Sequence, residues 1–84
     1  MEIKILNRAI SFEETSNTGL FRLIISDKDN RENIPLLLED NQIKIFKTML
    51  KNVNWESNIP FDYFKLIVAG CAKYAITAAY NIGV

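Results

Sequence analysis

The last 25 residues of the chain, from Pro60 to Val84, constrain its fold more than any other stretch because almost all of them are apolar. Their charged side chains are Asp62, Lys65 and Lys73. Apolar residues recur at spacings of three and four, which places them on one face of a helix. The members of this face are Phe61, Phe64, Val68, Cys71, Ala75, Ala78 and Ile82. We therefore predict one long helix over residues 60–82, covered on most sides by its own domain or by a partner.

A ridge of small side chains runs along the same helix at four-residue spacing and comprises Cys71, Ala75, Ala79 and Gly83. Small side chains let another backbone approach closely. The ridge is suited to packing on a sheet or on the preceding helix, or to a contact between two copies of the chain. We expect a homodimer, because three short strands and one other helix offer little cover for so apolar a helix.

The helix is not expected to cross a membrane. Its charge-free runs, residues 66–72 and 74–82, are each far short of the ~20 apolar residues that a bilayer requires. The N-terminal sequence MEIKILNRAI has no basic segment followed by an apolar one, so we expect no secretory signal. Ile, Asn and Lys are abundant while Arg and Gly are few, as in AT-rich genomes. The expected location is therefore the cytoplasm of a low-GC bacterial host.

Three stretches before residue 40 predict strands of an antiparallel sheet. Alternating apolar residues indicate strands at about residues 2–12, 20–26 and 34–38, with a bulge near Leu6–Asn7 where the alternation changes phase. Turn residues separate the three stretches. Pro35 cannot donate a hydrogen bond to a neighbouring strand, which assigns the third strand to an edge. The second strand is apolar on both faces, as expected of a central strand.

A shorter helix is predicted over residues 41–52. Its lysines, Lys44, Lys47 and Lys51, share one outward stripe, which is either a solvated face or a phosphate-binding surface. Trp55 follows in the link to the last helix. It either closes the bottom of the core or acts as a binding hot spot for a partner.

Together these elements predict an α+β fold with the order βββαα, in which a three-stranded antiparallel meander carries two antiparallel helices on one face. The 84 residues are expected to form a single domain, 1–84. Their hydrophobic content of 49% can supply a core without a disulfide or a metal.

The composition argues against an enzyme. The chain has no histidine and one cysteine, which removes the common pairs of nucleophile and base and the common zinc sites. Its three glycines form no phosphate-binding loop. The turn at residues 27–33 lacks the glycine of a calcium loop. We therefore expect no catalytic residues, no metal and no cofactor.

Charge is distributed unevenly although the net charge is zero. Residues 1–43 carry eight acidic and five basic side chains, and residues 44–84 carry two acidic and five basic ones. A meander should bring the first hairpin turn and the end of the third strand to the same end of the sheet. This gathers an acidic rim of Glu13, Glu14, Glu39 and Asp40. We expect the rim to steer the chain onto a basic groove, such as that of a host nucleic-acid enzyme, with solvated loop residues as the simpler alternative.

These features predict a small, non-enzymatic module that binds another protein. Its size, apolar content and lack of catalytic chemistry are similar in type to phage-borne proteins that inhibit host enzymes or defence systems, anti-CRISPR proteins among them, without a shared motif. The leading hypothesis is therefore a phage or mobile-element inhibitor or regulator of a bacterial protein. The alternatives are a nucleic-acid-binding regulator that uses the lysine stripe, and a small subunit of a larger complex.

Overall fold

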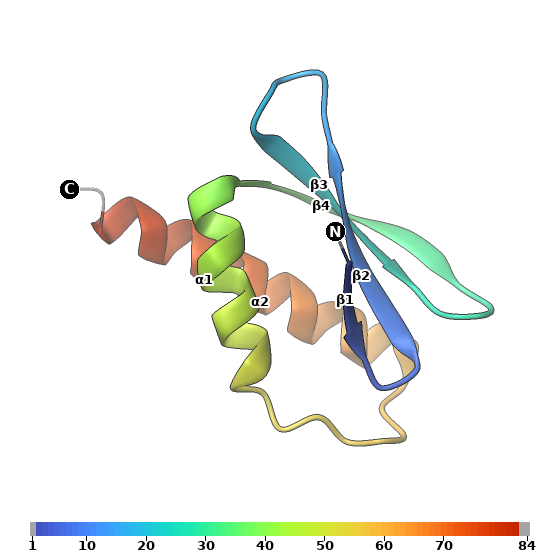
Figure 1. The fold of residues 1–84 in the computed structure, drawn as a ribbon. Coiled ribbons are helices and arrows are strands. Elements are labelled where there is room, and N and C mark those ends of the chain that lie inside the picture. The colour runs from blue at the N-terminus through green and yellow to red at the C-terminus, as the bar shows by residue number, and fades with distance from the viewer. Residues whose placement is uncertain (1, 83–84) are drawn as a thin grey trace.

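The computed structural model describes residues 2–82 of the chain, with the side chains of residues 2–80. Four strands are followed by two helices (Figure 1). The strands are β1 (Glu2–Ile5), β2 (Arg8–Glu14), β3 (Leu20–Ser26) and β4 (Arg31–Glu39). The helices are α1 (Asp40–Lys51) and α2 (Phe61–Ile82). The chain is therefore a single α+β domain with two helices, as predicted, but its sheet has four strands rather than three.

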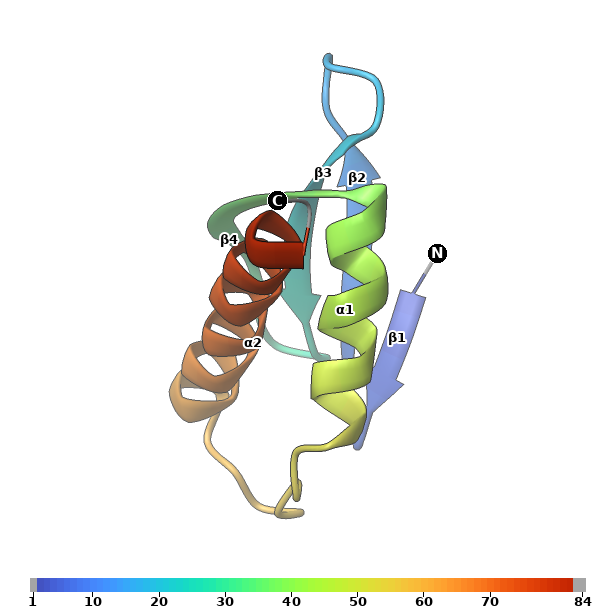
Figure 2. The same ribbon diagram turned by 90° about the vertical axis from the view of Figure 1, so that its left-hand side faces the viewer.

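The four strands form one antiparallel sheet in the order β1-β2-β3-β4, so each strand pairs with its neighbours in sequence. Both helices lie on the same face of this sheet, and they run side by side in opposite directions (Figure 2). Within residues 2–82, no helix lies over the opposite face of the sheet. The domain therefore has two layers, and its core lies between the sheet and the two helices.

The prediction of a single strand over residues 2–12 is wrong, because the chain reverses direction at Leu6 and Asn7. These two residues form a tight turn between β1 and β2, with Ile5 paired to Arg8. The change of phase in the apolar pattern therefore marks a hairpin and not a bulge. Leu6 has a φ of 59°, a left-handed conformation that glycine or asparagine usually adopts. Because a leucine stands there, the sequence carries no ordinary signal for this turn.

The third predicted strand, at residues 34–38, corresponds to a longer strand, β4, which contains an irregularity. The pairing of β3 with β4 shifts between Arg22 and Leu23, and the two extra residues of β4 are Pro35 and Leu36. β4 lies at an edge of the sheet, as Pro35 predicts, since proline has no N–H to donate to a neighbour. β3 lies inside the sheet, as its two apolar faces predict.

The core is built around two aromatic residues, one from each helix. Phe46 of α1 and Phe64 of α2 are fully buried. Phe12 of β2 meets Phe46 edge to face, with ring centroids 6.0 Å apart. The other large side chains that are fully buried are Ile10, Leu23, Ile25, Leu38 and Val68. The two helices are therefore held to the sheet by one continuous apolar layer.

Candidate functional site

The predicted acidic rim lies at one end of the sheet. The β2–β3 hairpin and the start of α1 meet there, and Leu20 of β3 pairs with Glu39 of β4 (Figure 1). A pocket of about 470 Å³ lies between the two segments. Its lining residues are Thr18, Gly19, Leu20, Glu39, Asp40 and Asn41. The fold thus places Glu39 and Asp40 beside the hairpin, where the sequence predicted them.

Glu13 and Glu14 have local partners within the hairpin. The Glu13 Oε1 atom lies 3.4 Å from Nη1 of Arg22, its partner across the strand pair. The Glu14 carboxylate accepts a hydrogen bond of 2.9 Å from the backbone N–H of Gly19. These contacts give both carboxylates a role in the turn, and the register of the hairpin is the signal that would have revealed the pair with Arg22.

Glu39 is occupied at the N-terminus of α1. It forms a capping box with Gln42, whose side-chain oxygen accepts a hydrogen bond of 2.8 Å from the Glu39 N–H. Asp40 follows as an acidic residue in the first turn, where a carboxylate complements the helix dipole. Local structure therefore accounts for the positions of the rim residues without a partner, and their role in recognition stays a prediction.

The lysine stripe lies on the outward side of α1. Lys44 and Lys51 are exposed, and Lys47 is partly buried. The helical spacing predicted this arrangement. Whether the three lysines contact phosphate stays a prediction.

Trp55 covers the end of the core between the two helices. Its indole N–H donates a hydrogen bond of 3.0 Å to the carbonyl oxygen of Leu50, and its ring centroid lies 5.2 Å from that of Phe64. The residue also lines a pocket of about 450 Å³. The other lining residues are Asn54, Glu56, Asn58, Ile59, Pro60, Tyr63 and Ile67. Trp55 is therefore partly committed to the core, and its role as a hot spot stays a prediction.

The small-residue ridge of α2 faces the core of its own domain. Cys71 and Ala75 are buried, and Ala79 is partly buried. Gly83 lies outside the described residues. Burial raises the pKa of the Cys71 thiol, which favours its neutral form. The ridge therefore packs within the chain, and its proposed use as a contact between two copies does not agree with this burial.

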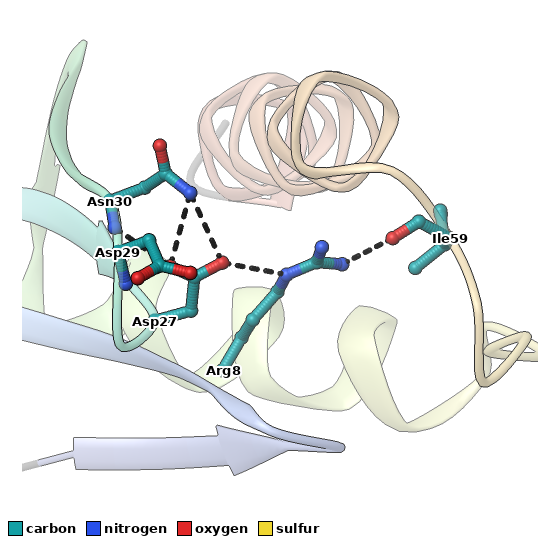
Figure 3. A network of polar contacts seen from close by, with 5 residues as sticks. All are labelled: Arg8, Asp27, Asp29, Asn30 and Ile59. Carbon is teal, nitrogen blue, oxygen red and sulfur yellow. Dashed lines mark hydrogen bonds and ion pairs between the residues drawn. The ribbon is translucent and has the colours of Figure 1, made fainter.

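Arg8 connects the sheet to the start of α2 (Figure 3). Its Nη1 donates a hydrogen bond of 2.6 Å to the carbonyl oxygen of Ile59, and its Nε lies 3.5 Å from Oδ2 of Asp27. The guanidinium carbon lies 5.1 Å from the ring centroid of Phe64 and 5.6 Å from that of Phe61. No local sequence pattern indicates a role for Arg8, because its partner at position 59 is 51 residues away.

Asp27 holds the turn between β3 and β4 together. Its Oδ1 atom accepts hydrogen bonds from the backbone N–H groups of Asp29 and Asn30, at 2.9 and 2.7 Å. The bond from Asp29 is the main cause that lowers the pKa of the Asp27 carboxyl, and bonds from Asn30 and Arg8 lower it further. The ionised carboxylate thus joins the β3–β4 turn to Arg8 and, through Arg8, to α2.

A row of large apolar side chains lies exposed on the side of α2 that faces away from the core. Tyr63, Leu66, Tyr74 and Tyr80 are between 55% and 74% exposed, and these include all three tyrosines of the chain. We call this surface the outer face of α2. It comprises Tyr63, Leu66, Gly70, Tyr74, Thr77 and Tyr80, with Asp62 and Lys73 along one edge.

Sequence analysis did not single out the outer face as a site. Beside this face, Ala69 is partly buried and Lys65 reaches across to β4. The Lys65 Nζ atom lies 2.6 Å from Oε2 of Glu32, which raises the pKa of Lys65. The available signal was the position of Tyr63 and Leu66 on the side of the helix opposite Phe64 and Val68.

Gly70 lies at the middle of the outer face. A Cβ atom built at this position meets nothing within 4 Å. Glycine inside a helix costs about 1 kcal/mol relative to alanine, because its backbone loses more freedom on folding. The packing of the chain itself therefore gives no reason for a glycine at this point.

The remaining chemistry of the described residues is sparse. Within residues 2–82, no three histidine, cysteine, aspartate or glutamate side chains are arranged to hold a metal ion. Over the same residues, neither helix is both long and apolar enough to cross a membrane. Among the described residues, the outer face of α2 holds most of the exposed large apolar side chains.

Comparison of the chain with known protein families, with characterised proteins and with solved structures finds no match.

Proposed function

We propose that this chain is a small, non-enzymatic module that binds another protein through the outer face of α2. The observation that carries the proposal is the row of exposed Tyr63, Leu66 and Tyr74 on a helix whose opposite side is buried. Extended apolar patches on a surface commonly mark interaction sites. Tyrosine is enriched at binding hot spots, since its ring buries a large area while its hydroxyl can still form a hydrogen bond.

The outer face is presented by a rigid support. Phe64 and Val68 anchor the inner side of α2 in the core, Arg8 holds its first turn, and Lys65 pairs with Glu32 of β4. A surface that is already ordered loses little conformational entropy on binding. Tyrosine side chains add to this advantage because they have two rotatable bonds to fix.

The nature of the partner follows from the surface only in part. A partner must present an apolar surface that α2 can cover. The predicted partner, a bacterial protein inhibited by a phage or mobile-element chain, stays a prediction. Steering by the acidic rim also stays a prediction.

The proposal is tested by capturing partners from a low-GC bacterial lysate, identifying them by mass spectrometry and measuring the affinity of each purified partner. Leu66→Lys and Tyr74→Lys should each weaken binding at least about tenfold, as expected for central contacts. Both variants should keep the thermal stability of the wild type, because the two side chains are exposed. Thr48→Lys, on the exposed side of α1, is the matched control. A partner that binds both α2 variants as tightly as the wild type would contradict the proposal.

Variants of the acidic rim and of the lysine stripe, the two surfaces predicted from the sequence, show whether binding uses them in place of the outer face. Replacing Glu13 and Glu14 by lysine should slow association and flatten its salt dependence if the rim steers the encounter. If the chain instead binds nucleic acid, electrophoretic shifts at low salt should show complexes that weaken steeply with salt. Those complexes should be lost when Lys44, Lys47 and Lys51 are replaced by alanine.

A further inference from the structure

Gly70 lies between large side chains on the outer face of α2. Leu66 and Tyr74 lie four residues to either side of it, and Tyr63 and Thr77 lie seven residues to either side. We infer that the partner on the outer face is a second copy of this chain, packed antiparallel about a two-fold axis at Gly70. The inference rests on the docking role proposed above for the outer face, and it identifies the protein bound there as a second copy of this chain in place of a different protein.

Gly70 has a physical role in such a pair. Where two helices cross, the distance between their axes depends on the side chains at the contact. A glycine at the crossing point lets the two backbones approach closely, so that the large side chains on either side can interdigitate. The open space around Gly70 within the chain is therefore filled by Gly70 of the second copy.

The antiparallel arrangement brings different groups to the same level. Each residue before Gly70 comes level with the residue equally far behind Gly70 in the other copy. Leu66 of one copy then lies against Tyr74 of the second copy, and Tyr63 lies against Thr77, whose small side chain leaves room for the ring. Each contact occurs twice, as a two-fold interface requires.

One edge of the outer face supports the antiparallel direction. Asp62 and Tyr80 are 18 residues apart, which is five helical turns, and Lys73 lies within about 20° of the same edge. In the antiparallel pair, Asp62 of one copy lies within about 3 Å, along the axis, of the level of Tyr80 of the second copy. Lys73 of the second copy is about 7.5 Å from the level of Asp62, within reach of its long side chain. A parallel pair would place Lys73 at the level of Lys73.

The available area indicates an interface of modest strength. Tyr63, Leu66, Tyr74 and Tyr80 together expose roughly 400 Å² per copy, since a large aromatic side chain offers about 150–250 Å². A standard interface buries about 800 Å² per partner. The four side chains thus supply about half of that area. We therefore expect weak, transient self-association.

This contact lies on the opposite side of α2 from the small-residue ridge. The ridge residues Cys71 and Ala75 are buried in the core and cannot reach a second copy. We therefore still expect a homodimer, but its contact surface is the outer face of α2 and not the small-residue ridge.

Sedimentation equilibrium of the full chain between about 1 μM and 1 mM measures the self-association. Gly70→Leu should weaken dimer formation at least about tenfold, because a leucine at the axis separates the two helices. The variant should still fold, since the space around Gly70 is open within the chain. Thr48→Leu adds the same side chain to the exposed side of α1 and should leave the dimer constant unchanged.

Disulfide cross-linking locates the axis and gives the direction of the helices. A disulfide requires two Cα atoms closer than about 7 Å. In a Cys71→Ala background, Gly70→Cys should cross-link to itself under mild oxidation. A mixture of Leu66→Cys and Tyr74→Cys chains should form the mixed disulfide, while neither variant alone should form one.

A chain that stays monomeric at about 1 mM overturns the inference. A dimer that survives Gly70→Leu overturns it as well, and so does a dimer in which Leu66→Cys cross-links to itself. A monomer that binds a different protein through Leu66 and Tyr74 overturns this inference and leaves the proposed function standing. If substitutions at Leu66 and Tyr74 weaken neither dimer formation nor the binding of another protein, this inference and the proposed function are both overturned.

Discussion

The two sides of α2 are both rich in apolar side chains, yet the molecule uses them differently. On the inner side, Phe64 and Val68 are fully buried, whereas on the outer side Tyr63 and Leu66 are 61% and 64% exposed. The difference arises because the sheet carries both helices on one face, so the domain covers α2 only from that direction (Figure 2). A small domain can thus bury one side of an apolar helix to fold and keep the other side for binding. Substitutions on the inner side should lower folding stability, and substitutions on the outer side should lower association.

Phe64→Ala should disrupt the packing of the inner side of α2 and have the largest effect on folding stability. Removing a fully buried aromatic ring should lower the free energy of unfolding by about 3–5 kcal/mol, because the transfer energy is lost and a cavity remains. Urea denaturation followed by circular dichroism measures the change. Tyr63→Ala, the adjacent residue on the outer side, should change the free energy of unfolding by no more than about 0.5 kcal/mol. Equal losses for the two variants would remove the distinction between the sides.

Arg8→Ala should loosen the inner side at the start of α2. The variant loses the hydrogen bond to the Ile59 carbonyl and the contact with the Phe64 ring. A hydrogen bond that involves a charged group contributes about 1.5–3 kcal/mol, and we expect a loss of that size in urea denaturation. Hydrogen exchange should increase in the first turn of α2. Arg22→Ala is the control, because its exposed pair with Glu13 should contribute about 0–1 kcal/mol. Unchanged exchange near Ile59 would show that Arg8 does not anchor the helix.

Gly70→Ala, on the outer side of α2, should stabilise the folded monomer. Alanine has the higher helix propensity, and its Cβ enters open space, so the monomer should gain about 1 kcal/mol. The measurement is denaturation at a concentration low enough to keep the chain monomeric. Ala75→Leu on the inner side is the counterpart, and overpacking there should lower stability by about 1–3 kcal/mol. A loss of monomer stability in Gly70→Ala would mean that the space around Gly70 is already filled.

Acid should remove the contribution of Asp27, which is the smallest effect expected here. Because its pKa is lower in the folded than in the unfolded chain, the ionised carboxylate stabilises the fold above its ordinary pKa. This contribution is lost as the pH falls through the folded pKa. The difference in melting temperature between the wild type and Asp27→Asn should therefore be constant near neutral pH and shrink below roughly pH 4. A difference that stays constant down to pH 2 would show that Asp27 has no such role.

Sequence reasoning succeeded where the pattern is local and strong. α2 begins and ends within a residue of the predicted range 60–82, and Phe64 and Val68 lie on the predicted buried side. It failed at Leu6, because a leucine with a positive φ carries no turn signal and the hairpin was read as one strand. Glu39 and Asp40 lie beside the β2–β3 hairpin, but the partners of Glu13 and Glu14 depend on the hairpin register, and the rim as a binding surface stays a prediction.

By itself, the sequence determined that the chain has two helices after its strands and that the last helix is too apolar to stand alone in water. Periodicity carries this information, because the side chains that it relates lie a few residues apart. Only the tertiary structure decided how much of α2 the domain covers. That outcome depends on which face of the sheet receives the helices and on contacts such as the bond between Arg8 and Ile59, across 51 residues. Such contacts are set by packing in three dimensions, which no local pattern records.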